Sequence, residues 1–264
     1  MSEKQISGLR LPDGAMLKLE YHKELSSTSS LAKSYANAGY PDRYAVFTEK
    51  QFTSAITGTK LSEGEGERGV FISVILRPSF FPSQVGPIGA LSTVALATAL
   101  ESHTTHALGI GWINSVYCDG VYIGGVSVEG KLNSFSSYEY LIVNFAVRLE
   151  DNHFPPRLTD MVKKVFENEN ASVNMIIAKT VLTRFFTVYS SIRSPEKFMD
   201  VYKRKFILLG KRISLLQDGK KRPCRVIDID KTSCALTVEE GNGTRTVVTS
   251  QSAVIIPRKI KLEK

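Results

Sequence analysis

Cysteine and long apolar runs are both scarce in this chain of 264 residues. Its three cysteines, Cys118, Cys224 and Cys234, are dispersed and lack metal-ligand spacing, which is typical of proteins in a reducing compartment. No apolar run reaches the roughly 18 uncharged residues that a membrane helix needs, and the polar start of the chain does not lead into a signal-peptide core. We therefore expect an intracellular, cytoplasmic protein with no membrane association, and import into an organelle stays open.

Negative charge is scarce in the last part of the chain. From Tyr202 onward there are 15 Lys and Arg residues against 6 Asp and Glu, and the whole chain carries a net charge of +8. Aromatic residues do not alternate with the basic runs 203–205 and 220–222, so nothing favours stacking on nucleic-acid bases. The basic segment is therefore interpreted as a solvated surface, with nucleic acid disfavoured as a partner and an acidic protein surface left open.

The first 204 residues carry a mixture of strand and helix patterns, which predicts an α+β domain. Apolar and alternating runs predict strands at 17–21, 44–47, 70–76, 116–117, 122–128 and 140–147, the fifth joined to the fourth by an Asp-Gly turn. Hydroxyl caps and apolar periodicity predict helices at 31–39, 89–101, 159–167, 173–193 and from 194 onward. The polar stretch 53–69 is expected to be a mobile loop.

From about residue 205 the pattern changes to short alternating strands. They are expected at 212–216, 225–229, 235–238, 245–248 and 253–256, with turn residues such as Gly241, Asn242 and Gly243 between them. This spacing predicts a small five-stranded barrel in a second domain, residues 205–264.

One segment in the middle of the chain carries the strongest motif. Residues 111–117 read G-W-I-N-S-V-Y and residues 119–125 read D-G-V-Y-I-G-G. They resemble the centre of the biotin–protein ligase and lipoate–protein ligase superfamily, in which the pattern is roughly K-W-P-N-D-I-Y followed by N-G-K-K-I-A-G-I. Trp112, Asn114 and Gly125 match the family, whereas the family's aspartate is Ser115 and its hairpin lysine is Tyr122.

The resemblance extends over nearly the whole chain. Ser27 and Thr28 stand in the family's D-S-T-N helix start, and Gln51 matches the glutamine that opens its Q-T-x-G-R-G-R-x-G-R nucleotide loop. The positions of G-R-G-R are 54–57, which read S-A-I-T. Segments 209–211 and 226–228 resemble its SH3-like C-terminal domain. The resemblance implies a class II synthetase-like biotin/lipoate ligase fold, a mixed central sheet with flanking helices, followed by an SH3-like barrel.

Enzymes of this superfamily join the carboxylate of biotin to the α-phosphate of ATP and then transfer the acyl group to a lysine of a carrier domain. The first step brings anions together, so positive charge must be concentrated at the site. Here the loop arginines, the hairpin lysine (Tyr122) and the metal-site aspartate (Ser115) are all replaced. The resemblance therefore implies a catalytically impaired, ligase-like binding or scaffold protein, with no catalytic residue assigned.

The alternative is a divergent active ligase or acyltransferase that forms an acyl-adenylate from biotin, ATP and Mg²⁺. Lys60 and Arg68, or Asp119 near the metal, would then replace the missing groups. Against this alternative, Val143 and Phe145 stand at glycine positions of the family's G-I-G-x-N pattern. We expect these larger side chains to narrow or fill the pocket.

The resemblance assigns a ligand pocket to seven residues, for which helix capping, loop closure and close strand packing are competing roles. They are Ser27, Thr28, Gln51, Trp112, Asn114, Tyr122 and Gly125. No metal site is expected, because His103 and His106 lack a Cys or acidic partner at suitable spacing. Cys118 is interpreted as a small buried hydrophobic residue. The expected partner is a biotinyl or lipoyl carrier domain or another protein, and a homodimer stays open.

Overall fold

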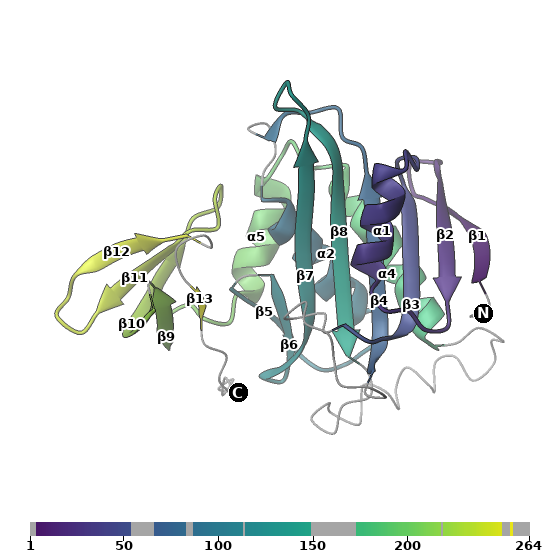
Figure 1. Cartoon of the computed structure of the whole chain (residues 1–264). Helices are drawn as coiled ribbons and strands as arrows, with labels where there is room; N and C mark the ends of the chain where they lie inside the picture. Colours follow the sequence, from purple (N-terminus) through teal and green to yellow (C-terminus); the bar gives the residue numbers. More distant parts are fainter. Residues whose placement is uncertain are drawn as a thin grey trace.

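The computed structural model describes residues 4–53, 66–82, 87–112, 114–148, 173–217 and 219–249, together with the backbone of residues 254–255. These residues form a large mixed sheet flanked by helices, followed by a smaller antiparallel sheet (Figure 1). The α+β architecture that the sequence predicts is confirmed. The predicted helix 159–167 and most of the predicted loop 53–69 lie outside the described residues.

Eight strands form the large sheet in the order β1-β2-β3-β4-β8-β7-β6-β5. β2 and β3 are parallel, and the other neighbours are antiparallel. The strands are β1 (Lys4–Arg10), β2 (Met16–His22), β3 (Tyr44–Gln51), β4 (Glu67–Leu76), β5 (Leu108–Gly111), β6 (Ser115–Cys118), β7 (Val121–Leu132) and β8 (Tyr138–Arg148). The sequence does not predict β1, because this edge strand is exposed along nearly its whole length and has no buried alternation.

Helices cover the two faces of this sheet unequally. Among the described helices, α1 (Thr28–Asn37) lies in front of it, whereas α2 (Ile88–Glu101) and α4 (Val173–Tyr189) lie behind it (Figure 1). α1 buries Ala32 and Ala36 in a small cluster that includes Tyr44, Ile75 and Ile142. The helices behind the sheet, with α5 (Glu196–Lys205), share the main hydrophobic core. The α1 face is therefore the more polar face of the sheet.

The predicted helix start and hairpin turn both take the expected geometry. Ser27 is the N-cap of α1, and its hydroxyl accepts a hydrogen bond from the Ser30 amide at 3.2 Å. Asp119 and Gly120 have φ angles of 48° and 79°, the left-handed conformation of a two-residue hairpin turn. One detail differs, because α5 begins at Glu196 and no side chain caps it.

The five predicted C-terminal strands are all present. β9 (Arg212–Gln217), β10 (Lys220–Ile229), β11 (Leu236–Glu240), β12 (Arg245–Val248) and β13 (Val254–Ile255) form one antiparallel sheet in the order β12-β11-β10-β9-β13. Among the described residues no helix is long and apolar enough to cross a membrane.

Candidate functional site

One edge of the large sheet gathers several of the predicted pocket residues. β3 ends at Gln51 and β8 ends at Arg148, while β4 begins at Glu67 and β7 begins at Val121. Strand register places Gln51 opposite Glu67, and α1 starts at the same edge (Figure 1). The candidate site is this edge together with the adjoining α1 face, and the predicted nucleotide loop 54–57 lies outside the described residues.

Thr28 and Gln51 lie together at the start of α1. The Gln51 Oε1 accepts a hydrogen bond from the backbone N–H of Thr28 at 3.4 Å, and its Nε2 donates to the carbonyl oxygen of Thr53 at 2.8 Å. Both side chains are buried. The structure therefore brings Thr28 and Gln51 into contact, with Ser27 beside them as the N-cap of α1. Several polar atoms of these residues are used in hydrogen bonds within the protein.

A track of polar side chains continues from Thr28 across the α1 face. Ser73 on β4 lies 2.9 Å from the Thr28 hydroxyl and donates to the Asn144 Oδ1 on β8 at 2.7 Å. Asn144 in turn donates to Ser127 and Glu129 on β7, at 3.2 and 3.3 Å. The sequence does not predict this track, although strict alternation places all its strand residues on one face.

Glu129, the last residue of this track of polar side chains, connects it to α1. Its carboxylate accepts hydrogen bonds from the Ser29 hydroxyl at 2.7 Å and from the Lys33 ammonium at 2.5 Å. Partial burial opposes ionisation, but the bonds from Lys33 and Ser29 outweigh it and hold the pKa of Glu129 below its ordinary value. Glu129 is therefore a paired carboxylate that joins β7 to α1.

Tyr122 is half-buried at the start of β7. Its ring meets Tyr117 edge to face, with the centroids 5.8 Å apart. Burial raises the pKa of Tyr122 to about 12, against the opposing effect of the nearby Arg148 cation. Arg148 forms an ion pair with Glu67, so its charge is offset by a carboxylate of the same site. The phenol at this position is therefore neutral at physiological pH.

Asn114 and Gly125 lie together where β6 pairs with β7. The Asn114 carbonyl oxygen accepts from the Val126 amide at 2.8 Å, and a Cβ atom on Gly125 would lie only 2.6 Å from that oxygen. The Asn114 amide packs against α2, where a Cβ on Gly89 would lie 2.4 Å from its Nδ2. Both residues thus have the loop-closing and close-packing roles that compete with ligand binding.

The indole of Trp112 faces the segment that leads into β11 of the C-terminal sheet. It is 5% exposed, and its Nε1 donates a hydrogen bond to the Cys234 carbonyl oxygen at 2.8 Å. The Ser115 hydroxyl lies beside the Gly111 backbone, 2.7 Å from where a Cβ on that glycine would be. Neither side chain is brought to Thr28 or Gln51.

The expectation that Val143 and Phe145 narrow the pocket is wrong. Both side chains are in the main core behind the sheet, where the Phe145 ring lies 5.4 Å from the Phe185 ring of α4. Successive residues of a strand point to opposite faces, so the α1 face of β8 carries Asn144, which bonds Ser73 and Ser127. A difference of one residue in register exchanges the two faces.

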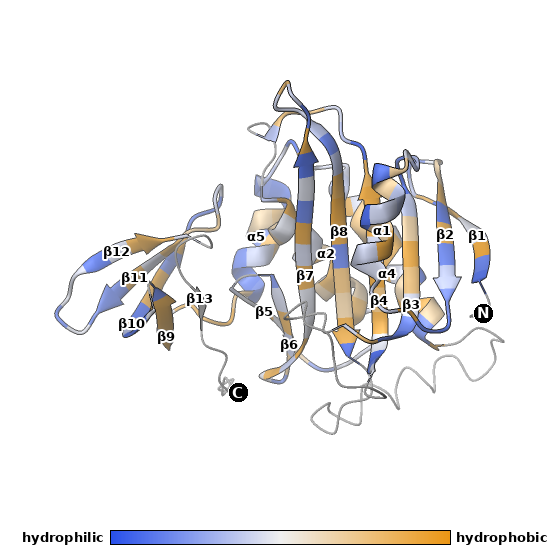
Figure 2. Cartoon of the chain, in the orientation of Figure 1, coloured by the Kyte–Doolittle hydropathy of each residue, from blue (hydrophilic) through white to orange (hydrophobic). Residues whose placement is uncertain are grey.

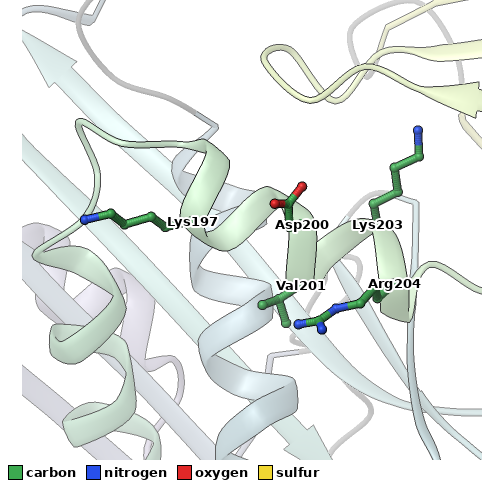
Figure 3. Close-up of a pocket in the computed structure, with 5 residues that line it drawn as sticks. All are labelled: Lys197, Asp200, Val201, Lys203 and Arg204. Atoms are coloured by element: carbon green, nitrogen blue, oxygen red, sulfur yellow. The ribbon is translucent and has the colours of Figure 1, made fainter.

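A hollow of about 530 Å³ lies on the exposed side of α5. Figure 3 shows its lining residues, Lys197, Asp200, Val201, Lys203 and Arg204, with Asp200 and Lys203 directed toward the C-terminal sheet. These two pair with Lys231 at 2.5 Å and with Asp228 at 2.6 Å, respectively. The hollow contains none of the predicted pocket residues and marks the junction between the two sheets.

Sequence comparison finds relatives of one kind. No family model matches the chain. The bifunctional ligase/repressor BirA of Bacillus subtilis is 26% identical over 144 residues, which are 54% of this chain and 44% of BirA. BirA of Bacillus spizizenii is 22% identical over 157 residues, 59% of this chain and 48% of the relative. The chain thus matches less than half the length of these curated relatives.

Comparison of structures gives the same kind of relative over most of the chain. Biotin protein ligase from Aquifex aeolicus, solved as a mutant in complex with biotin, has a TM-score of 0.67 at 18% identity, covering 91% of this chain and 98% of that one. A biotin protein ligase-like protein of unknown function from Silicibacter has a TM-score of 0.60 at 11% identity, covering 88% and 94%. The fold is therefore that of the biotin protein ligases, including the small C-terminal sheet.

Proposed function

Since the chain has the biotin protein ligase fold, we propose that it is a ligase-like binding protein in which adenylate formation is impaired. Its proposed partner is a biotinyl or lipoyl carrier domain, which it binds as a scaffold without transferring an acyl group. The likeness to a bifunctional ligase/repressor and to solved biotin protein ligases supports a protein partner of this kind.

The observation that carries this proposal is the charge balance around Tyr122. Joining a carboxylate to a triphosphate requires positive charge at the reacting centre, which the superfamily supplies in part by a lysine at this position. The phenol of Tyr122, with a pKa of about 12, supplies none, and the neighbouring Arg148 is paired with Glu67. Loss of one well-placed electrostatic donor costs about 10²–10³ in rate, so this balance favours impaired catalysis.

Retention of an ordered α1 face supports a binding role. Thr28, Gln51, Ser73 and Asn144 hold one another by hydrogen bonds, so this face does not need a ligand to keep its geometry. Satisfied polar networks of this kind rigidify a surface and give it one conformation. A rigid surface binds a folded partner without a large loss of conformational entropy.

A divergent active ligase is the second candidate, and Arg148 is the observation that favours it. Its guanidinium lies close enough to Tyr122 to lower the phenol's pKa, against the larger effect of burial. A biotin carboxylate or an ATP phosphate entering this edge would compete with Glu67 for the same cation. In that case Arg148 would take the role that the resemblance gives to a lysine at position 122.

Binding to a carrier domain tests the first proposal directly. The purified protein is titrated calorimetrically with a non-biotinylated biotinyl carrier domain, and then with the same domain carrying Gln at its target lysine. Each mixture is afterwards incubated with biotin, ATP and Mg²⁺, and the mass of the carrier domain is measured. A scaffold binds both forms with comparable affinity and leaves the mass of the wild-type domain unchanged. No binding at concentrations where a competent ligase binds the same domain would overturn the scaffold proposal. Addition of biotin mass to the wild-type domain alone would establish the second candidate.

A further inference from the structure

Three side chains with metal-binding atoms meet beside the hairpin of β6 and β7. The Nδ1 of His106 lies 2.5 Å from the Oδ2 of Asp119, and the metal-binding atoms of His106, Cys118 and Asp119 all lie within 4.8 Å of one another. His106 comes from the segment before β5, whereas Cys118 ends β6 and Asp119 starts the turn. Spacing along the sequence, from which no metal site is expected, does not reveal that His106 lies beside these two residues.

Backbone geometry explains how two consecutive residues point to one place. Neighbouring residues of a regular strand face opposite sides, but Asp119 has a φ of 48° and leaves the strand in the left-handed turn conformation. Its amide donates to the carbonyl oxygen of Ala107 at 3.2 Å, which ties the turn to the segment that carries His106. The Thr104 hydroxyl accepts from the His106 amide at 3.1 Å and orders that segment further.

The donor set has the chemistry of a zinc site with one open position. Zn²⁺ is bound in tetrahedral geometry by imidazole nitrogen, thiolate sulfur and carboxylate oxygen, at about 2.0–2.3 Å from each atom. Two atoms on one tetrahedral ion stand roughly 3.3–3.7 Å apart by that geometry, so ligands now within 4.8 Å of one another need only small rotations. A soft thiolate with imidazole selects Zn²⁺ or Co²⁺ rather than Mg²⁺.

We propose that His106, Cys118 and Asp119 form a binding site for a single zinc-type divalent transition-metal ion on the β6–β7 hairpin. Binding converts the Cys118 thiol to a thiolate and releases its proton to solvent. The Asp119 side chain is 48% exposed, so this side of the site faces solvent. The fourth coordination position of the metal ion is open there to water or to a ligand atom of a partner. The site lies on the hairpin that leads into β7, and it does not depend on the proposed carrier-domain function.

A nucleophilic cysteine is the competing interpretation of the same cluster. Reactive cysteines are partly exposed and have lowered pKa values. The Cys118 side chain is fully buried, so a substrate in solvent cannot reach its thiol. Coordination fits this environment better, because a metal ion displaces the thiol proton and neutralises the resulting charge.

Cobalt titration of the full chain tests the site. The reduced, chelator-treated protein is titrated with Co²⁺, whose thiolate complexes give an intense charge-transfer band in the near ultraviolet. We expect a band that saturates at one Co²⁺ per chain, that is lost on adding Zn²⁺, and that is absent in Cys118→Ser. Cys224→Ser is the matched control, because Cys224 is a buried free cysteine of the other domain and its loss should leave the band unchanged.

Two further variants keep the test decisive if Cys118→Ser does not fold. Asp119→Asn and His106→Gln alter ligands that are not fully buried, and each is expected to weaken Co²⁺ binding by at least about tenfold while circular dichroism stays native. Absence of a charge-transfer band in the wild type would overturn the proposal. A band that persists in Cys118→Ser, or that disappears equally in Cys224→Ser, would also overturn it.

Discussion

The indole N–H of Trp112 donates a hydrogen bond to the backbone carbonyl oxygen of Cys234, with an N···O distance of 2.8 Å. The two residues are 122 positions apart; Trp112 directly follows β5 of the large sheet, and Cys234 lies just before β11 of the small sheet. The same interface has two ion pairs between exposed or half-exposed side chains, Lys203–Asp228 and Asp200–Lys231, and such pairs contribute little. The motif tryptophan therefore makes a buried polar contact between the large sheet's β5 end and the segment that leads into the C-terminal sheet.

Replacing Trp112 with Phe should loosen this interface. The change removes one buried hydrogen bond and leaves the Cys234 carbonyl without this partner, which costs about 1 kcal/mol in free energy of unfolding. Urea unfolding followed by circular dichroism measures the loss, since Trp112 is the sole tryptophan and its fluorescence disappears with it. The control is Phe135→Leu, an aromatic substitution at a side chain that is 82% exposed. Equal stability of the two variants would contradict this contribution of the Trp112 hydrogen bond.

A buried carboxylate on β2 should govern the acid stability of the protein. Glu20 is fully buried and accepts hydrogen bonds from Tyr44, from Tyr35 at 2.9 Å and from His22 at 2.7 Å. Burial opposes ionisation, but these bonds, together with Lys4, hold its pKa below the ordinary value of 4.5. A lowered native pKa contributes stability above the unfolded value, and that contribution is lost as the pH falls through the native pKa.

Glu20→Gln should therefore be less stable than the wild type by about 1–3 kcal/mol at pH 7, because the amide cannot accept all of these bonds. The difference should shrink as the pH falls from 4.5 toward the lower native pKa of Glu20, where the folded carboxylate becomes protonated. Urea unfolding at a series of pH values measures both effects. Glu239→Gln, which removes an ion pair with the exposed Arg245, is the control and should be nearly neutral. A pH-independent loss in Glu20→Gln would refute the assignment.

The pair Lys33–Glu129 should contribute modestly, since the two side chains are 47% and 40% exposed. Screening by solvent limits such a pair to roughly 0.3–1 kcal/mol. The hydrogen bond to Glu129 raises the pKa of Lys33, and the pKa of Glu129 is lowered, so the coupling is present at neutral pH and disappears in acid. A double-mutant cycle with Lys33→Met and Glu129→Gln measures it. A coupling of the same size at pH 7 and well below the Glu129 pKa would argue against an ion pair.

Gly125→Ala tests whether this motif glycine is scaffold. A Cβ at this position would lie 2.6 Å from the Asn114 carbonyl oxygen, a backbone atom that cannot swing aside. Overpacking of this kind costs about 1–3 kcal/mol. Gly241→Ala is the matched control, because nothing lies within 4 Å of a Cβ there. If thermal unfolding shows no difference between the variants, the close approach of β7 to Asn114 is not a structural requirement.

Local sequence patterns predict much of the fold. The hydroxyl cap at Ser27, the turn at Asp119 and Gly120 and the buried helix α2 all follow from interactions within a few residues. Figure 2 shows the alternating hydrophilic and hydrophobic bands along β7 that make such strands recognisable. Elements of this kind are determined by neighbours along the chain, so no tertiary information is needed to find them.

The site is less predictable, because contacts across the sheet decide it. Sequence similarity to a family does not show on which face of β8 the side chains of Val143 and Phe145 lie. Alternation along the strand places both in the core. His106 and Asp119 meet only because β5 and β6 pair, and the same pairing brings in Cys118. The Trp112 indole is oriented by a hydrogen bond to the Cys234 carbonyl oxygen, 122 positions along the chain. Each of these contacts joins residues that no local pattern connects.

The most direct test of the account is a mass-spectrometric assay for biotinyl-adenylate and lipoyl-adenylate. The purified protein is incubated with ATP, Mg²⁺ and each acid, beside a competent biotin protein ligase and a blank without protein. The neutral Tyr122 and the paired Arg148 predict no adenylate above the blank while the competent ligase forms it. Adenylate above the blank that disappears in Arg148→Gln would contradict impaired catalysis and identify the cation that replaces the missing lysine.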